Sequence, residues 1–450
     1  MASAELLRRP AVARLASVLQ HFPPVTSAFA YGSGVHHQPG LYDSGSEGAQ
    51  PSSAQADDPS RLASSASAST SSSSSTTSSE TALQKSFPSG TTWRPSSSNA
   101  LAGSASGSRK GPILDFIFAV HDEQKWHETN LKRNPEHYSW VGNLGANALC
   151  AITEAVGVGV HFNTLVQLDE TTMVKYGVVQ ADIMEHDLLY WTSLYIAGRM
   201  HKPVTHLLPM PQWLVDAELE NRHHALATAL ALLPQTFTEH DLLTTIVGLS
   251  YRGDVRMAAR AEDPAKVSRI VAGSWEGLTA MYRPLLGSNR YASLGLERAG
   301  ETATGEELWR REAGPHMACP SLELLPPGLM HEVAASLDYH VPLEHLHHGE
   351  TTQREIAAAA AKTGRHTALV VEALERINRR SSAYQAAAGL MAAGGGKAVT
   401  YVAAKVGKAL APLMASAQAQ ARQLAAASPV QLSLPAWPGK AAADEEAGRK

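Results

Sequence analysis

Two short stretches, Phe29-Ala30-Tyr31-Gly32-Ser33-Gly34-Val35 and Leu114-Asp115-Phe116-Ile117-Phe118-Ala119-Val120, decide the fold of this chain. In the first, the run Ala28–Tyr31 leads into a glycine-rich turn, which is typical of a strand that ends at a tight bend. The second is a continuous apolar run of strand length, which predicts a buried strand. One carboxylate, Asp115, interrupts it, and a buried charge is costly unless it is paired or bound to a metal.

The glycine turn and the carboxylate together are typical of nucleotidyltransferases. Backbone N–H groups at Gly32-Ser33 can approach the oxygens of a triphosphate, and Asp115 can hold a Mg²⁺ ion that bridges those oxygens. Two other interpretations stay open on these residues alone. The glycines can form an ordinary turn, and Asp115 can be the buried partner of an arginine.

The segment between the two strands, residues 43–110, is dominated by Ser, Thr, Ala and Gly and includes the run Ser71–Ser75. Such a composition cannot bury enough apolar surface to fold, so we expect a disordered insert. Without the insert, the glycine turn and Asp115 are separated by a hairpin-like distance. The tail, residues 428–450, has no hydrophobic periodicity, and we expect disorder there as well.

Composition limits the class of protein. The 450 residues carry a net charge of −4, and the pI is about 6.6. This balance lacks the basic excess of a nucleic-acid-binding chain, so we expect no nucleic acid as a partner. The two cysteines, Cys150 and Cys319, form neither a disulfide framework nor a zinc-binding pattern, which favours a reducing compartment such as cytosol or matrix.

Membrane contact, if present, is expected to be peripheral. No window approaches the roughly 18 consecutive apolar residues that a spanning helix needs. The N-terminal stretch Ala4–Gln20 has three arginines and an apolar face, which would suit a short transit peptide. The alternative is a helix that leads into the first strand, and both can be true.

The remaining ordered sequence predicts an α/β core that is followed by a mainly helical part, with a boundary near residues 205–215. Two further apolar strands are expected, at Gly159–Leu168 and Thr172–Val179. Apolar residues at three- and four-residue spacing predict helices at Asp187–Arg199, Glu218–Leu233 and Glu239–Leu249. The region Gly287–Pro327 contains Gly and Pro and is expected to be loose.

The Ala-rich segment 371–427 predicts a long amphipathic helix. At 100° per residue, one arc collects Val399, Val402, Val406, Leu410 and Leu413, and the opposite arc collects Lys397, Lys405 and Lys408. One interpretation is that this helix binds an anionic leaflet through its basic face. The other is an ordinary surface helix that docks through its apolar stripe.

Longer motifs across the ordered chain resemble the translocator assembly and maintenance family. Besides the two opening stretches, the resemblance lies in Trp126–Lys132, Asn134–Ser139, Lys175–Val178, Asp187–Leu189, Leu194–Arg199, His201–Val204 and Gly248–Arg256. Together these motifs span most of the ordered chain outside the insert and the tail. Several long motifs in one order are far more specific than any single motif.

The resemblance implies a peripheral mitochondrial CDP-diacylglycerol synthase, which makes CDP-diacylglycerol and pyrophosphate from CTP and phosphatidic acid, upstream of cardiolipin. It implies Mg²⁺ as the cofactor, and a place on the matrix side of the mitochondrial inner membrane, at an anionic, cardiolipin-rich surface. The implied architecture is a nucleotidyltransferase domain (1–42 plus 111–205), a helical, winged-helix-like domain (206–370) and a C-terminal amphipathic membrane-contact helix (371–427).

The matched positions define the expected site. The resemblance implies that Gly32, Ser33 and Gly34 bind the CTP phosphates and that Asp115 binds the metal. Lys175 would neutralise a phosphate, although a solvated strand lysine is the alternative. The other expected CTP contacts are Tyr195, Arg199 and Lys202, and the last two have a second interpretation as charges that complement a helix C-terminus. His127, Asn130 and His137 also match, without an assigned role.

The chain departs from the family pattern in three places. Many nucleotidyltransferases carry a second carboxylate two residues after the first, where this chain has Ile117. The second metal ligand is therefore expected elsewhere, with Asp187 as the leading candidate and Asp122 and Asp43 as the others. His186 stands where relatives often have an acid, and Tyr384 where they usually have a basic residue.

Two other functions stay open from the sequence. One is a non-catalytic maintenance factor for mitochondrial protein import that binds membrane or translocase subunits. The other keeps the nucleotidyltransferase fold and changes the acceptor to protein or RNA.

Overall fold

The structure is a computed structural model that describes residues 10–36, 113–156, 158–258, 263, 265–312, 314, 317–346 and 350–392. The predicted insert, the predicted tail and Asp43 lie outside these residues. So do residues 393–427, which hold the valine stripe and the three lysines of the predicted amphipathic helix. The predictions for these segments stay predictions.

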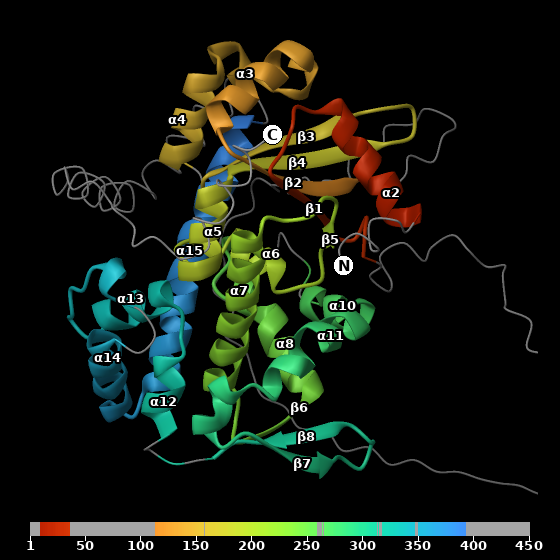
Figure 1. Cartoon of the computed structure of the whole chain (residues 1–450). Helices are drawn as coiled ribbons and strands as arrows, with labels where there is room; N and C mark the ends of the chain where they lie inside the picture. The colour runs from red at the N-terminus through yellow and green to blue at the C-terminus, as the bar shows by residue number, and fades with distance from the viewer. Residues whose placement is uncertain are drawn as a thin grey trace, which may run out of the picture. The chain divides into compact units, whose positions relative to one another are not determined.

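A five-stranded sheet with the order β3-β4-β2-β1-β5 forms the first part of the fold (Figure 1). The strands are β1 (Ser27–Tyr31), β2 (Leu114–Val120), β3 (Val160–Gln167), β4 (Met173–Gln180) and β5 (Thr205–His206). Strands β2 and β4 run parallel, and the other neighbours run antiparallel. The four longer strands confirm the four apolar runs that the sequence predicted as strands.

Each face of the sheet is covered by different elements, because successive side chains of a strand point to opposite faces. Phe29, Ile117 and Val179 pack into a large core with helices that include α5 (Ala181–Tyr190), α6 (Ile196–Met200) and α7 (Gln212–Leu232). Phe118 and Tyr176 point to the other face. There they pack with Phe22, after η1 (Ser17–His21), and with Trp126 on α3 (Glu123–Arg133).

The second part of the chain is mainly helical, as predicted, and adds a three-stranded antiparallel sheet with the order β6-β8-β7. Its strands are β6 (Thr236–Thr238), β7 (Glu297–Glu301) and β8 (Glu307–Arg310). Its helices are α8 (Glu239–Gly248), η4 (Leu249–Tyr251), α9 (Val255–Ala258), α10 (Lys266–Gly273), α11 (Trp275–Leu286), η5 (Asn289–Leu294), α12 (Ala318–Glu323), α13 (Pro327–Ala335), η7 (Leu343–His345), α14 (Thr351–Lys362) and α15 (His366–Ala392). The remaining elements are α2 (Pro10–Ala16), η2 (Pro135–His137), η3 (Trp140–Leu144) and α4 (Ala146–Val156).

Two predictions about the secondary structure need correction. The predicted helix Asp187–Arg199 is two helices, because Trp191 and Leu194 adopt left-handed backbone angles (φ 57° and 53°) that end α5 before α6 begins. The predicted loose region Gly287–Pro327 contains η5, β7, β8 and α12. Here antiparallel pairing with β6 orders a segment whose own sequence shows little periodicity.

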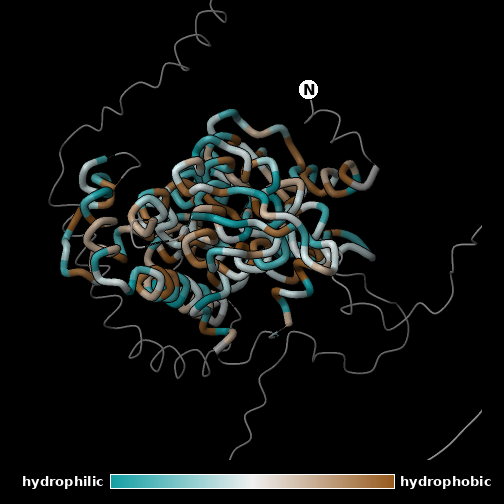
Figure 2. The backbone as a smooth tube through the Cα atoms, turned by 90° about the horizontal axis from the view of Figure 1, so that it is seen from below, coloured by the Kyte–Doolittle hydropathy of each residue, from teal (hydrophilic) through white to brown (hydrophobic). Residues whose placement is uncertain are grey.

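A shared hydrophobic core joins the sheet to the helical part. One buried cluster runs from Phe29 on β1 through α7 and α8 to Ile377 on α15. Figure 2 shows hydrophobic and hydrophilic residues mixed along the chain, as expected for elements that bury one side each. No helix among the described residues combines the length and hydrophobicity that a membrane crossing requires.

Candidate active site

The register of β1 and β2 brings the glycine turn to Asp115. Tyr31, the last residue of β1, lies directly opposite Asp115 on β2. A Cβ atom built on Gly32 would be 3.1 Å from Oδ2 of Asp115. The prediction that these two motifs meet across adjacent strands is therefore confirmed.

The turn requires its glycines for two different reasons. Gly32 has a left-handed backbone angle, φ +80°, which residues other than glycine rarely adopt. Gly34 has no such angle, but a Cβ there would be 2.4 Å from the carbonyl oxygen of Ile113. After Gly32 the chain winds into a single turn, in which the N–H groups of Val35 and His36 both donate to the Gly32 carbonyl.

Lys175 is the cross-strand neighbour of Asp115 on the parallel strand β4. Its Nζ is 3.9 Å from Oδ1 of Asp115, and the two side chains are 35% and 26% exposed. Burial lowers the pKa of Lys175 and raises the pKa of Asp115, although each partner's charge acts in the opposite direction. Burial thus outweighs the pairing for both groups, an arrangement that is more frequent at functional sites than elsewhere.

Arg199 lies in an aromatic cage on the same face of the sheet. Its guanidinium carbon is 3.7 Å from the ring centroid of Tyr195 and 5.3 Å from that of Tyr31. Nη1 donates to the carbonyl of Tyr195 at 2.8 Å, while Nε is buried without a hydrogen-bond partner. The hydroxyl of Tyr31 is also buried and interacts with the Arg199 side chain. An unpaired buried polar atom such as Nε is costly, so a polar ligand that reaches it would relieve a penalty.

Lys202 follows α6 and contacts η4 of the helical part. Its Nζ donates to Oγ of Ser250 at 3.0 Å and is 5.0 Å from the ring centroid of Tyr251. Burial, with the positive charges of Arg199, Lys266 and Arg256, lowers the pKa of Lys202 to about 7. Gly198 permits this contact between α6 and η4, because a Cβ there would be 2.5 Å from Cβ of Ser250.

The fold adds three residues that the sequence did not assign to the site: Tyr251, Arg256 and Lys266. Arg256 is held by the buried carboxylate of Asp254 through Nε and Nη2. Nζ of Lys266 is 5.7 Å from the ring centroid of Tyr251. Tyr251 and Arg256 stand in a motif that carries the family resemblance, but nothing in that motif ties them to the strands. Lys266 has no sequence signal at all.

The hydrogen bonds of Asp187 favour a structural role, and its predicted role as a metal ligand stays a prediction. Its Oδ1 accepts hydrogen bonds from the backbone N–H and the hydroxyl of Ser193 and from the N–H of Leu194. Its Oδ2 accepts from the N–H groups of Ile196 and Ala197. A carboxylate offers about four acceptor positions, and these five donors occupy them.

Asp122 likewise has a structural role. It caps α3 by accepting the N–H of Lys125 at 2.9 Å. Asp122 follows the far end of β2, and the five residue steps from Asp115 to Val120 alone span roughly 17 Å at about 3.3 Å per step. No cluster of three metal-binding side chains occurs in the described part of the chain. Asp115 can still hold Mg²⁺, since this ion is often bound by one carboxylate together with substrate phosphates.

His127, Asn130 and His137 face away from the site. They form a buried network on the opposite side of the sheet, where Asn130 Nδ2 donates to the hydroxyls of Tyr138 and Tyr176. Nδ1 of His127 is 2.8 Å from the Tyr138 hydroxyl, and Nδ1 of His137 is 3.2 Å from the Tyr176 hydroxyl. Burial lowers the pKa of His127 to about 3, so this histidine is neutral at physiological pH.

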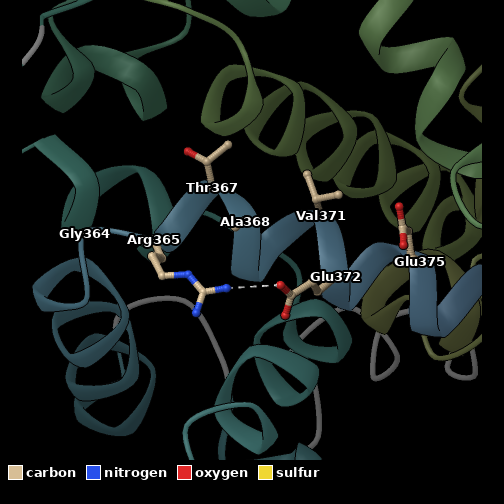
Figure 3. A pocket seen from close by; sticks show the side chains of 7 residues that line it. All are labelled: Gly364, Arg365, Thr367, Ala368, Val371, Glu372 and Glu375. Carbon is tan, nitrogen blue, oxygen red and sulfur yellow. Dashed lines mark hydrogen bonds and ion pairs between the residues drawn. The ribbon is translucent and has the colours of Figure 1, made fainter.

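Two cavities lie elsewhere on the molecule. One, of about 640 Å³, runs along α15 and is lined by Gly364, Arg365, Thr367, Ala368, Val371, Glu372 and Glu375 (Figure 3). Arg365 pairs there with Glu372 at 3.5 Å, and Glu375 pairs with Arg379 at 3.6 Å, so the lining offers no excess of positive charge to a triphosphate. The other, of about 330 Å³, is lined by residues that include His186, Asp187 and Tyr384. Neither is lined by Gly32 or Asp115.

Comparison with known proteins gives a consistent result. A family model described as "Phosphatidate cytidylyltransferase, mitochondrial" matches residues 15–408. Proteins of that name from Danio rerio and Schizosaccharomyces pombe are each 42% identical to this chain, over 185 and 178 residues. These alignments cover 41% and 40% of this chain, and 54% and 45% of the relatives, so the chain spans about half the length of these relatives. The protein of that name from Xenopus laevis is 34% identical over 314 residues, which is 69% of this chain and 88% of the relative.

Proposed function

Since the chain belongs to the family described as mitochondrial phosphatidate cytidylyltransferase, we propose that it transfers a cytidylyl group from CTP to phosphatidic acid. The products are CDP-diacylglycerol and pyrophosphate. The observation that carries this proposal is the meeting of the Gly32 turn, Asp115 and Lys175 on one face of the sheet. A glycine turn, a carboxylate and a lysine are the groups that a metal-bound triphosphate requires.

The proposed reaction is an in-line displacement. A phosphate oxygen of phosphatidic acid attacks the α-phosphorus of CTP, and the bond to the bridging oxygen of the pyrophosphate breaks. The attacking oxygen is already anionic near neutral pH, so no protein base is needed. The protein's contribution is to position two anions and to offset their charge, which is the main source of catalysis in phosphoryl-type transfers.

Each predicted site residue except Asp187 has a place in this proposal. The turn of Gly32, Ser33 and Gly34 approaches the phosphates closely because it has no side chain at two positions. Asp115 would hold Mg²⁺, which supplies charge neutralisation at the phosphate oxygens when it is bound. Lys175 and Arg199 then neutralise further phosphate charge. Tyr195 acts through Arg199. The Tyr195 ring stacks against the guanidinium of Arg199, and the Tyr195 carbonyl accepts a hydrogen bond from it. Lys202 extends the positive surface toward η4.

We also propose a mitochondrial location, on the matrix side of the inner membrane, with peripheral attachment to an anionic, cardiolipin-rich surface. The printed names of the relatives support the mitochondrial part. The product would feed cardiolipin synthesis. Within the predicted segment 371–427, the part that follows α15 is proposed as the membrane contact, because Leu374 and Ile377 on α15 are buried in the core. Residues 206–370 are proposed as a winged-helix-like domain. The comparisons give no support to the alternative of a non-catalytic import factor.

The test is a transfer assay with the purified chain, Mg²⁺, phosphatidic acid vesicles and CTP that is labelled at the α-phosphate. We expect the label to enter the lipid fraction, and we expect CTP labelled at the γ-phosphate to leave its label in water. Asp115→Asn should lower the rate by about a hundredfold or more, because removing a charged transition-state contact typically costs that much. Absence of lipid labelling by the unaltered protein would contradict the proposal, and labelling of added protein or RNA instead would point to another acceptor.

A further inference from the structure

A group of cations lies on the helical elements next to the proposed CTP site. Arg256 is on α9, Lys266 is the first residue of α10, and Lys202 lies against η4. The ammonium groups of Lys202 and Lys266 flank one aromatic ring, that of Tyr251, at 5.0 and 5.7 Å from its centroid. We call Arg256 and Lys266 the helical cluster; Lys202, an expected CTP contact, lies beside it.

Arg256 is fixed in place by a buried partner. Asp254 is 3% exposed and accepts from the backbone N–H, Nε and Nη2 of Arg256, the last at 2.6 Å. The Arg256 side chain nevertheless remains 46% exposed. Asp254 is itself positioned by the helical part, because the N–H of the next residue, Val255, donates to Ser382 on α15. The guanidinium is thus held rigidly while part of it faces outward.

Two of the cations in this region pair with carboxylates, and two others bond to uncharged groups. Lys175 pairs with Asp115, and Arg256 pairs with Asp254. Arg199 and Lys202 instead bond to a carbonyl and to a hydroxyl, neither of which carries charge. Arg199, Arg256 and Lys266 all act on Lys202 to disfavour its charged form. An anion placed among these groups would relieve that repulsion.

We propose that the helical cluster binds the phosphate monoester of the lipid acceptor, in a subsite distinct from the triphosphate site on the sheet. The proposal rests on the proposed function, which requires two polyanions to meet at one place. One triphosphate and one phosphate monoester together bring more negative charge than the sheet residues alone can offset. A second group of cations would offset the remaining negative charge.

The chemistry of the helical cluster fits a monoester better than a triphosphate. The glycine turn and the carboxylate suited to Mg²⁺ are both on the sheet, at Gly32 and Asp115. The acid beside the helical cluster, Asp254, is engaged by three donors of Arg256 and has little capacity left for a metal. A monoester needs charged donors rather than a metal, and a fixed guanidinium can give it two hydrogen bonds. The exposure of Arg256 suits a headgroup that arrives from a membrane surface.

The test measures the two ligands separately on the full chain. Binding of Mg²⁺-CTP and of soluble dihexanoyl phosphatidate is titrated by calorimetry, the latter without CTP. Lys266→Ala should weaken phosphatidate binding by about tenfold and leave CTP binding within about twofold, because a charged contact is worth enough to change affinity by that factor. Arg256→Lys keeps the charge but loses the planar guanidinium that can donate two hydrogen bonds to one phosphate, so it should also weaken phosphatidate binding. Lys132→Ala, on the exposed side of α3, is the matched control and should change neither.

Three results would overturn the subsite. Equal weakening of both ligands by Lys266→Ala would assign the cluster to the triphosphate. Unchanged binding of both ligands in Lys266→Ala and Arg256→Lys would exclude an anion role. Unaltered protein that binds CTP but no phosphatidate would exclude the acceptor. Thermal unfolding of each variant shows whether it is folded. Failure of the proposed function looks different, since the unaltered protein would then bind phosphatidate without making product from CTP.

Discussion

Lys202 is a lysine on which the charges of three other cations act. Burial and the charges of Arg199, Lys266 and Arg256 lower its pKa to about 7, so at pH 7.5 most of it is neutral in the free protein. A bound triphosphate would raise that pKa. Binding of CTP at pH 7.5 should therefore take up about half a proton or more per site, and affinity should fall as the pH rises above 7.

Calorimetry in two buffers that differ in ionisation enthalpy measures this proton uptake directly. Lys202→Arg is the matched variant, because arginine stays charged throughout. It should bind CTP without proton uptake and with little pH dependence between pH 7 and 9. Equal proton uptake by the two proteins would show that another group titrates.

The site could be predicted from sequence where strands carry it. Gly32 and Asp115 stand in or beside apolar runs, so their chain positions fix their places in the sheet once β1 and β2 pair. The position of Lys175 is predictable in the same way, because it stands in the apolar run that forms β4. Arg256 and Lys266 could not be found this way, because they lie on short helices with no periodic link to the strands. Only tertiary packing brings them to the site.

At the scale of the elements, Asp187 joins α5 to α6. Its carboxylate satisfies four backbone N–H groups of the segment between and at the start of these helices. Asp187→Ala would leave buried donors such as those of Ile196 and Ala197 without partners. We expect it to lower the free energy of unfolding by about 2–4 kcal/mol, measured by urea denaturation.

Asp182→Ala is the matched control, since Asp182 lies in the first turn of the same helix and is exposed. It should change stability by less than about 0.5 kcal/mol. A stable Asp187→Ala protein that no longer binds metal-CTP would contradict the structural role and return Asp187 to the metal site.

The same carboxylate explains why the helix prediction over Asp187–Arg199 was wrong. The spacing of apolar residues there suits a continuous helix, and no Gly or Pro interrupts α5. The break comes from Trp191 and Leu194 in left-handed angles, with Asp187 accepting the N–H groups that the broken helix leaves unpaired. Strands β3 and β4 were easier to predict, because their apolar runs are short and bounded by an acidic turn.

At the scale of the whole molecule, buried ionisable groups make stability depend on pH. Burial, with the nearby charge of Glu154, raises the pKa of Glu123 to about 8. The folded protein thus keeps a proton that the unfolded chain releases near pH 4.5, so Glu123 makes stability fall as the pH rises toward 8. His127 and His161, with pKa values lowered to about 3, act oppositely, but only below about pH 6.5.

Urea unfolding between pH 6.5 and 8 covers the window in which Glu123 lowers stability and in which Lys202, whose pKa is lowered to about 7, acts oppositely. The comparison of Glu123→Gln with the unaltered protein isolates the effect of Glu123. Glu123→Gln should remove the fall in stability that Glu123 causes. The free energy of unfolding of the variant should therefore increase with pH, relative to that of the unaltered protein, across this window. Parallel pH profiles for the two proteins would mean that Glu123 is ionised in the folded state.

The overall order of a sheet followed by helices could be predicted, while the sharing of one core could not. Periodicity reports which face of a segment is buried, but not which distant segment covers it. The cluster that joins Phe29 to Ile377 depends on α7 and α15 packing back toward the sheet. The formation of β7 and β8 likewise depends on pairing with β6, a strand of three residues that is too short to show a sequence pattern.

The central claim is that one carboxylate, Asp115, and the turn at Gly32 hold a metal-bound triphosphate. Electron paramagnetic resonance of Mn²⁺, used in place of Mg²⁺, tests it most directly. Free Mn²⁺ gives a sharp signal that broadens when the ion is bound. The unaltered protein should bind Mn²⁺ tightly only when CTP is present, and Asp115→Asn should lose that CTP-dependent binding while remaining folded. Undiminished CTP-dependent Mn²⁺ binding by a folded Asp115→Asn protein would contradict the account.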